Sequence, residues 1–425
     1  MTGTATAAEE FKMTEIGPLP IEWGVTKFGE LVAEITTGDW GETNPGNDLQ
    51  KCYVLRGTDF SRVFKGSFAN IPIRYLRPSS LQKRRLYKGD ILIELSGGSK
   101  DQPTGRVAMV TGELIGRSTL PLVFSNFVKR LSVKSSLLPE FCWHYWEFLY
   151  QSGVTRTYEK RTTGIRNFKL DDFLASEYIP LPPLPEQKRI TYFLSTVQTA
   201  IEKTEAVIRA TRELKKSLMK HLFTYGPVSI DQVENIRLKE TEIGMVLEEW
   251  EVKPLVDIAT LQRGKDLPKQ KQIWGKYPVV GSSGVMAYHN QAPCRGPGVV
   301  TGRSGSIGNL TYIEEDYWPH NTSLYVKDFH NNNPKFTYYL LHLIDFRKYA
   351  TGVSVPTLNR NFVHVAMLPV PPSEVQRHIA NILTMVDRRA ETEENKRQAL
   401  EALFKTLLTR LMTGKIRVNN LEAPV

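Results

Sequence analysis

The chain has 425 residues, of which 41% are hydrophobic and 24% charged, and its formal net charge is +10 at pH 7. This length predicts roughly two to four domains, each able to bury a core. No run of about 18 apolar residues is present, which argues against a transmembrane helix and a membrane partner. The N-terminus lacks a basic and apolar leader, so we expect a cytoplasmic protein. The positive charge favours a polyanionic partner.

The cysteines and histidines indicate neither metal binding nor catalysis. Cys52, Cys142 and Cys294 are far apart and form no C-x-x-C pair, so we expect free thiols in a reducing compartment. The eight histidines are scattered, and none occurs in an H-E-x-x-H or similar ligand spacing. We therefore predict no metal site, no catalytic residues and no cofactor bound by the chain itself.

The chain opens with a small, polar tail at 1–13, which we expect to be disordered. A first domain is predicted over 14–183 and begins with TEIGPLPIEWGVTKF. Within it, 89–95 and 105–110 are predicted to be strands, joined by a glycine-rich loop, and 139–152 a helix. Residue type and loop position make the following candidates for DNA contact: Lys83, Arg84, Arg85, Ser99, Lys100 and Arg106.

A long helix is predicted over 184–226, and a second over 373–414. Proline and Glu186 mark the start of the first, and the S-x-x-Q sequence at Ser373 resembles a capping box. Each helix spans about 40 residues, or roughly 60 Å. Both carry an apolar repeat every 3.5 residues, the pattern of a coiled-coil seam. The predicted pairing residues are Ile190, Leu194, Val197, Ile201, Ile208, Leu218 and Leu222 in the first helix, and Ile379, Leu383, Val386, Leu400, Phe404, Leu407 and Leu411 in the second.

Between the helices, 227–372 is predicted to be a linker and a second domain, and 415–425 a short tail. Strands are expected within 277–290 and 296–313, and a helix over 334–350. The loop GRSGSIG matches neither a phosphate-binding loop nor a hydrolase elbow; a tight hairpin turn and a DNA-facing loop both remain open. The candidates for DNA contact here are Arg263, Lys265, Lys269, Lys271, Ser282, Ser283, Arg303 and Ser304.

Two internal repeats relate the domains. TEIGPLPIEW at the first opening returns as TEIGMVLEEW at 241–250, and IPLPPLPEQKRI at 179–190 returns as LPVPPSEVQRHI at 368–379. The segments between these repeats differ in length and show little similarity. We interpret this pattern as one shared scaffold that carries two recognition domains of different specificity. It predicts a mixed α/β fold, with two globular α/β domains joined by two long antiparallel helices in a pseudo-two-fold internal repeat.

These motifs, with GDILIELSGGS, YPVVGSSGV, VVTGRSGSIG and LMTGKIRV, resemble the DNA-specificity subunits of type I restriction–modification systems over nearly the whole chain. The resemblance implies two target-recognition domains, each reading one half of a bipartite, asymmetric target in double-stranded DNA. It also implies two antiparallel helices that hold these domains at a fixed distance and dock two methyltransferase subunits, joined by restriction subunits. S-adenosylmethionine, ATP and Mg are then expected on the partner subunits.

Two alternatives stay open on the sequence. One is a restriction or modification enzyme with an unrecognised active site in one domain. The other is a coiled-coil adaptor with no nucleic-acid role, which predicts that the chain does not bind duplex DNA even at low salt.

Overall fold

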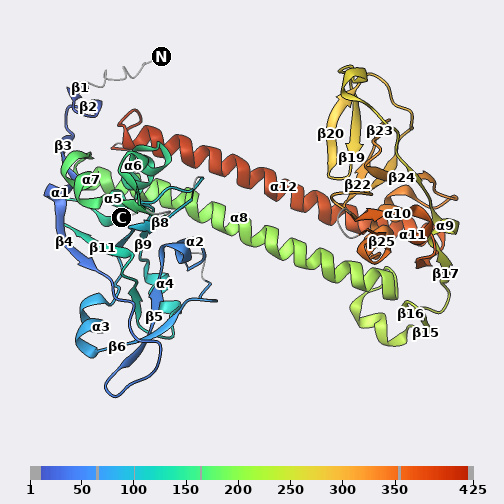
Figure 1. Ribbon diagram of the computed structural model, residues 1–425, viewed down its shortest axis with the longest axis horizontal. Helices are drawn as coiled ribbons and strands as arrows, with labels where there is room; N and C mark the ends of the chain where they lie inside the picture. The colour runs from blue at the N-terminus through green and yellow to red at the C-terminus, as the bar shows by residue number, and fades with distance from the viewer. Residues whose placement is uncertain (1–10, 64–66, 100, 163–164, 353–355, 420–425) are drawn as a thin grey trace, which may run out of the picture. The chain divides into compact units, whose positions relative to one another are not determined.

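The computed structural model describes residues 11–63, 67–99, 101–162, 165–352 and 356–419 (Figure 1). The chain divides into two compact units: unit 1 comprises 1–205 and 396–425, and unit 2 comprises 206–395. In the described part of the chain, no helix is long and apolar enough to cross a membrane.

Unit 1 is built around an antiparallel sheet of four strands in the order β4-β11-β7-β9. A second sheet has the order β10-β5-β6, with β10 parallel to β5. Helix α5 packs on the first sheet, where Trp146 donates a hydrogen bond from Nε1 to the carbonyl oxygen of Gly105 at 3.0 Å. The strands are β1 (Phe11–Thr14), β2 (Gly17–Pro20), β3 (Gly24–Lys27), β4 (Val32–Thr37), β5 (Gln50–Leu55), β6 (Ile73–Leu76), β7 (Ile91–Glu94), β8 (Ser96–Gly97), β9 (Val107–Met109), β10 (Leu122–Phe124), β11 (Val128–Val133), β12 (Glu159–Thr162), β13 (Ile165–Phe168) and β14 (Tyr178–Leu181). The short helices are α1 (Phe28–Leu31), α2 (Phe60–Val63), α3 (Pro78–Arg84), α4 (Gly112–Arg117), α5 (Pro139–Gln151), α6 (Val154–Thr157) and α7 (Leu170–Ser176).

Unit 2 has a four-stranded antiparallel sheet in the order β18-β24-β21-β22, and a second sheet in the order β20-β19-β23, with β19 parallel to β23 (Figure 1). Its strands are β15 (Leu238–Thr241), β16 (Gly244–Leu247), β17 (Glu251–Pro254), β18 (Thr260–Arg263), β19 (Tyr277–Gly281), β20 (Gly284–His289), β21 (Gly298–Gly302), β22 (Leu310–Ile313), β23 (Trp318–Pro319), β24 (Ser323–Asp328), β25 (Ala350–Thr351), β26 (Thr357–Leu358) and β27 (Met367–Val370). Its short helices are α9 (Leu255–Ile258), α10 (Pro334–Leu341) and α11 (Arg360–Val363).

The segments between the repeated motifs, one in each unit, share more structure than their sequences suggest. Lys129 pairs with Thr37 and Ile93 in unit 1, just as Leu324 pairs with Arg263 and Thr301 in unit 2. The two segments therefore differ in residue identity, as expected, but share their sheet topology. Hydrogen bonds between strands join backbone atoms and tolerate many different side chains. Strand order and register therefore persist while the sequence diverges. Unit 1 is longer because α2, α3 and α4 lie between its strands.

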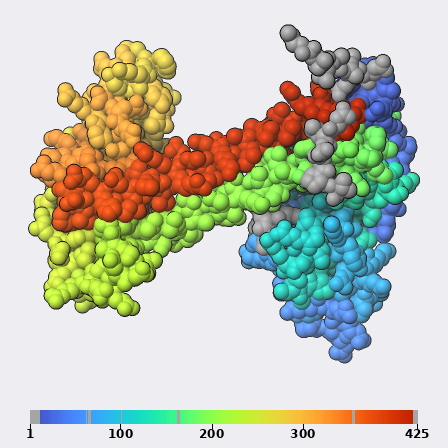
Figure 2. Space-filling model, turned by 180° about the vertical axis from the view of Figure 1, so that it is seen from behind, coloured from blue at the N-terminus to red at the C-terminus, as the bar shows by residue number. Residues whose placement is uncertain are grey.

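The two long helices are α8 (Leu184–Tyr225) and α12 (Ser373–Met412). In unit 1 the first turns of α8 pack against the last turns of α12, and in unit 2 the last turns of α8 pack against the first turns of α12. The helices are therefore antiparallel, and they lie side by side in Figures 1 and 2.

The residues of the predicted apolar stripe are buried or partly buried. Ile190, Leu194, Ile201, Ile208, Leu222, Ile379, Leu383 and Leu411 are buried, and Val197, Leu218, Val386, Leu400, Phe404 and Leu407 are partly buried. The sequence pattern missed Leu408 and Met412, which are buried in the core of unit 1. They lie beside the stripe because a helix end that enters a globular core buries a wider face than a two-helix seam does.

The repeated glutamines explain one of the sequence repeats. Gln187 accepts a hydrogen bond from the backbone N–H of Leu138 at 2.9 Å, and Gln376 accepts one from Asn333 at 3.0 Å. In both units, the donor residue immediately precedes a helix, α5 or α10. Each glutamine also donates to the carbonyl oxygen five residues before it, at 2.8 and 2.9 Å. The repeat thus ties the start of each long helix to the domain that precedes it.

The repeated tryptophans lie next to the ends of the long helices. Gly226, with φ +78°, follows α8 and packs near Trp250, whereas Gly414, with φ +64°, follows α12 and packs near Trp23. The left-handed φ favours glycine at both positions. Each opening motif therefore contacts the end of the long helix that closes the other repeat.

Three sequence predictions need correction at element boundaries. The N-terminal tail was predicted over 1–13, but Phe11–Thr14 forms β1 and pairs with β2, and 1–10 lies outside the described residues. The C-terminal tail was predicted over 415–425, but Arg417 ion-pairs with Glu186 at 2.6 Å and Val418 is buried, whereas 420–425 is not described. The helix predicted over 334–350 ends at Leu341 and is followed by a separate 3₁₀ turn, Phe346–Tyr349.

Candidate nucleic-acid interface

Six of the predicted DNA-contact residues of unit 2 lie at one edge of its sheets, which we call the unit 2 edge. It is formed where β18, β19 and β21 end and β24 begins, and it carries Arg263, Lys265, Ser282, Ser283, Arg303 and Ser304. Backbone hydrogen bonds hold these loops together. The N–H of Arg303 donates to the carbonyl oxygen of Thr322 at 2.9 Å, and that of Lys265 donates to Pro319 at 2.7 Å. The structure thus brings together residues that are spread over about 40 positions of sequence.

The other two candidates of unit 2, Lys269 and Lys271, follow Lys265 by four and six residues, on a separate 3₁₀ turn. Both side chains are exposed on this turn, which precedes the start of β19. Ser282 and Ser283 of the unit 2 edge, in contrast, follow the end of β19. They are solvated cations, and within the described residues no ion pair involves either of them. They can add to the positive field of unit 2, but they do not lie among the loops of the edge.

In unit 1, two of the predicted candidates serve structural roles. Arg84 donates from Nε to the carbonyl oxygen of Thr37 at 2.9 Å and from Nη1 to Ser80 at 2.8 Å. Arg106 makes a bidentate ion pair with Glu94, whose side chain is 1% exposed. The pair occupies the Nε and Nη2 donors of Arg106 and fixes its orientation, so this side chain is not free to turn towards a base.

Three other candidates of unit 1, Lys83, Arg85 and Ser99, are exposed and lie in two different segments. Lys83 and Arg85 are exposed at the end of α3. The side-chain oxygen of Ser99 accepts a hydrogen bond from the N–H of Gln102 at 3.1 Å, which makes the glycine-rich loop a local turn. Lys100 lies outside the described residues.

A cavity of about 430 Å³ opens at the matching edge of unit 1, which we call the unit 1 edge. Its lining includes Trp40, Thr58, Ser125, Asn126 and Phe127, and sequence reasoning selected none of them. These residues come from three separate loops, at the end of β4, after β5 and before β11. Only the register of the sheet brings them together, so no sequence motif signals them.

The same register position in unit 2 carries different side chains. The N–H of Ser125 donates to Leu55 at 2.9 Å, and that of His320 donates to Val280 at 2.8 Å, so Ser125 and His320 are equivalent. Nδ1 of His320 lies 3.0 Å from Oγ1 of Thr322, and Asn321 donates a hydrogen bond to Asp266. Burial lowers the pKa of His320 below its usual value, which favours the neutral ring.

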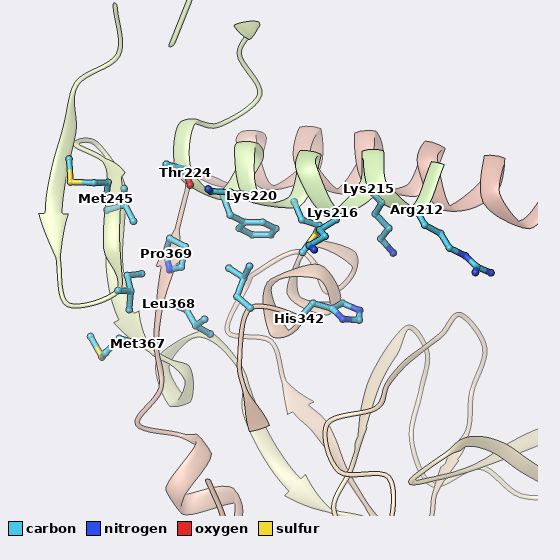
Figure 3. Close-up of a pocket in the computed structure, with 15 residues that line it drawn as sticks. Arg212, Lys215, Lys216, Lys220, Thr224, Met245, His342, Met367, Leu368 and Pro369 are labelled. Atoms are coloured by element: carbon cyan, nitrogen blue, oxygen red, sulfur yellow. The ribbon is translucent and has the colours of Figure 1, made fainter. Parts of the chain in front are cut away.

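A second hollow, of about 660 Å³, lies in unit 2 at the end of α8 (Figure 3). Four cationic side chains of α8 line it: Arg212, Lys215, Lys216 and Lys220. Most other residues of the lining are apolar, among them Met245 and Met367, which Figure 3 shows on the opposite side from the lysines. Lys215 is paired with Asp387 at 2.6 Å, while Lys216 and Lys220 are exposed. The hollow therefore combines an apolar floor with a positively charged rim.

The described residues contain no group of three His, Cys, Asp or Glu side chains placed to hold a metal ion. Cys52 and Cys142 are buried, and burial raises their pKa to about 11 and about 12, so both thiols stay protonated. Cys294 is partly buried rather than fully buried.

Comparison with known proteins identifies the class. The family model "Type I restriction modification DNA specificity domain" matches residues 20–209 and 247–402, once in each repeat. The MjaX and MjaVIII type I restriction enzyme specificity subunits of Methanocaldococcus jannaschii are 25% and 24% identical to this chain. These matches cover 96% and 97% of this chain and 97% of each relative. A crystal structure of the type I restriction–modification S subunit from M. genitalium has a TM-score of 0.63 at 17% identity and covers 92% of this chain and 96% of its own.

The chain therefore belongs to the family of type I restriction–modification DNA specificity subunits. Subunits of this class recognise DNA and are non-catalytic, which sets aside the enzyme alternative. The internal duplication read from the sequence corresponds to the two separate matches of the family model.

Proposed function

We propose that the chain reads a bipartite, asymmetric DNA target, with unit 1 reading one half and unit 2 the other. The observation that carries this proposal is the shared sheet register with unlike side chains at the two edges. Unit 1 presents Trp40, Ser125 and Phe127, whereas unit 2 presents Arg263 and His320. Two readers with different side chains recognise different base sequences, so the two halves of the target differ, unlike the palindromes that symmetric dimers read.

The spacing of the two half-sites belongs to the same proposal. Its support is that α8, with 42 residues, and α12, with 40, each run without a break from one unit into the other. A helix of this length extends about 60 Å, whereas one turn of DNA is about 34 to 36 Å. Continuous helices of fixed length would give the target a spacer of fixed length.

We also propose that two methyltransferase subunits dock on this chain, that restriction subunits join them, and that S-adenosylmethionine, ATP and Mg bind to these partners. The hollow at the end of α8 supports docking of one such partner, because its apolar floor and its rim of Lys216 and Lys220 fit an amphipathic segment with acidic residues. The charge-reversal variant Lys216→Glu/Lys220→Glu is expected to weaken assembly by about tenfold or more. Lys188→Glu/Lys203→Glu reverses two exposed lysines in the half of α8 that belongs to unit 1 and is the matched control, measured by titration with the methyltransferase subunit.

The test of the function is a map of methylated adenines in cells that carry this chain and its methyltransferase partner. The expected result is one motif with two unlike halves and a fixed gap, which disappears when the gene for this chain is deleted. A variant of one edge, such as Arg303→Ala in unit 2, is expected to relax recognition in one half only. A motif that survives the deletion, or a variant that alters both halves equally, contradicts the proposal.

A further inference from the structure

The cavity at the unit 1 edge contains a polar group that the fold itself does not use. Ser125 is 0% exposed and lines the cavity, and among the described residues its Oγ has no hydrogen-bond partner. Its backbone, in contrast, is fully engaged, because its N–H donates to Leu55 and its carbonyl oxygen accepts from Val128. Buried hydroxyl groups almost always find a partner. The Ser125 hydroxyl, which has no partner among the described residues, is therefore available to a group that enters the cavity.

The aromatic rings of Trp40 and Phe127 line the cavity beside Ser125. Trp40 is held from one side by Arg74, whose guanidinium lies 4.8 Å from the ring centre. Phe127 is 54% exposed at the same cavity. Arg56, which also lines the cavity, is fixed by a bidentate pair with Asp59. Aromatic faces with a nearby hydrogen-bonding group are the features by which proteins hold unstacked bases.

The shape of the site decides which form of DNA it accepts. Bases within a duplex present only their edges, which protein side chains reach by entering a groove. A concave site must instead receive a group that leaves the helix, and a volume of about 430 Å³ is within the range of small-molecule sites. Extrusion of a nucleotide places a whole base in such a pocket.

We propose that this cavity binds one base of the half-site read by unit 1, after that base is extruded from the duplex. The Ser125 hydroxyl forms a hydrogen bond with the edge of the base, and the ring of Phe127 packs on its face. This inference rests on the proposed function. Unit 2 lacks this arrangement, because the residue equivalent to Ser125, His320, already contacts Thr322. One half of the target is thus read with a base out of the helix and the other half within an intact duplex.

Mismatch scanning tests the extrusion. The probe is the mapped target duplex, bound by the complex of this chain with its methyltransferase subunits. In each duplex, the base opposite one position of the unit 1 half-site is changed, and the methylated adenines are left out of the scan. A mismatch removes the pairing that opposes extrusion, so binding is expected to tighten about tenfold at one position, and at none in the unit 2 half.

Two pairs of variants assign the effect to the cavity. Phe127→Ala is expected to abolish the mismatch gain and to weaken binding about tenfold. Tyr87→Ala, which removes an equally exposed aromatic ring of unit 1 outside the cavity, is expected to leave both unchanged. Ser125→Ala is expected to weaken binding about fivefold, whereas Thr155→Val removes another buried, unpartnered hydroxyl without effect on DNA.

The outcomes separate the inference from the function it rests on. Specific binding of the target with no mismatch gain at any position overturns the extrusion and leaves the proposed function standing. A loss of affinity in Phe127→Ala without a mismatch gain in the parent also overturns it, since Phe127 then contacts an intact duplex. Equal binding of target and unrelated duplexes overturns the proposed function itself.

Discussion

At the ends of β7 and β21, the two units place unlike residues at the same backbone position. Glu94 in unit 1 pairs with Val128 in the sheet, as Gly302 in unit 2 pairs with Ser323. Glu94 holds Arg106 in a buried ion pair, whereas a Cβ at Gly302 would meet the carbonyl oxygen of Ser306 at 1.9 Å. One edge is thus supported by side chains and the other by a close approach of backbones. The comparison teaches that the sheet fixes where the edge loops lie, and the local packing fixes which side chains can be placed there.

The largest expected effect comes from breaking the ion pair that only unit 1 has at this position. Glu94→Ala leaves Arg106 buried without its partner, so the free energy of unfolding of unit 1 should fall by about 3 to 5 kcal/mol. Hydrogen exchange of unit 1 amides in the full chain measures this. The control is Arg117→Ala, which removes an exposed pair with Glu113 and should cost at most about 1 kcal/mol. A similar cost for both variants contradicts the structural role of Glu94.

The repeated glutamines should, in contrast, give equal effects in the two units. Gln187→Ala and Gln376→Ala each leave a backbone donor without its partner, which should lower the stability of the unit concerned by about 2 kcal/mol. The exposed hydrogen bond of Gln198 to Glu202 provides the control, and Gln198→Ala should change stability by less than about 0.5 kcal/mol. Hydrogen exchange, read separately for the two units, distinguishes equal roles from unequal ones.

The pH dependence of stability should be steeper in unit 2, because burial lowers the pKa of His320, His342 and His364 there. The one histidine of unit 1 is His144. Burial lowers the pKa of His144 to about 3, and that of His342 in unit 2 to about 4. The unfolded chain therefore binds protons that the folded units exclude, and each unit loses stability as pH falls below about 6.5, by at most about 1.4 kcal/mol per pH unit and histidine. Urea unfolding at pH 7 and pH 5 measures this. His144→Leu should flatten the dependence in unit 1, and an unchanged slope in that variant contradicts the assignment.

The smallest effect concerns the salt dependence of DNA binding. Arg263 occupies the position in unit 2 that Thr37 occupies in unit 1, and it is 55% exposed. Arg263→Ala should reduce the slope of log affinity against log salt by about one and weaken binding severalfold. Thr37→Ala should leave the slope unchanged. If both variants keep the parent slope, Arg263 does not contact phosphate.

Periodicity and repeats were enough to predict the long helices and the doubled organisation, because a 3.5-residue stripe and a repeated opening are local patterns. The shared sheet was not predictable in this way, since Lys129 and Leu324 hold the same register without resembling each other. For the same reason, Arg106 was chosen by residue type alone, although its carboxylate partner lies 12 residues away on a neighbouring strand. Ser125 and Phe127 were missed because no spacing relates them to Trp40.

The composition of unit 1 also bears on the order in which the protein forms on the ribosome. Unit 2 is one continuous stretch, 206–395, whereas the core of unit 1 includes Leu408, Leu411 and Met412, which are made after all of unit 2. A nascent chain can therefore complete the second unit before the first, the reverse of the usual N-terminal-first order. A chain cut short before α12 ends leaves the core of unit 1 open and its apolar surface exposed to chaperones and proteases. Synthesis of α12 thereby becomes a condition for unit 1 to complete its core.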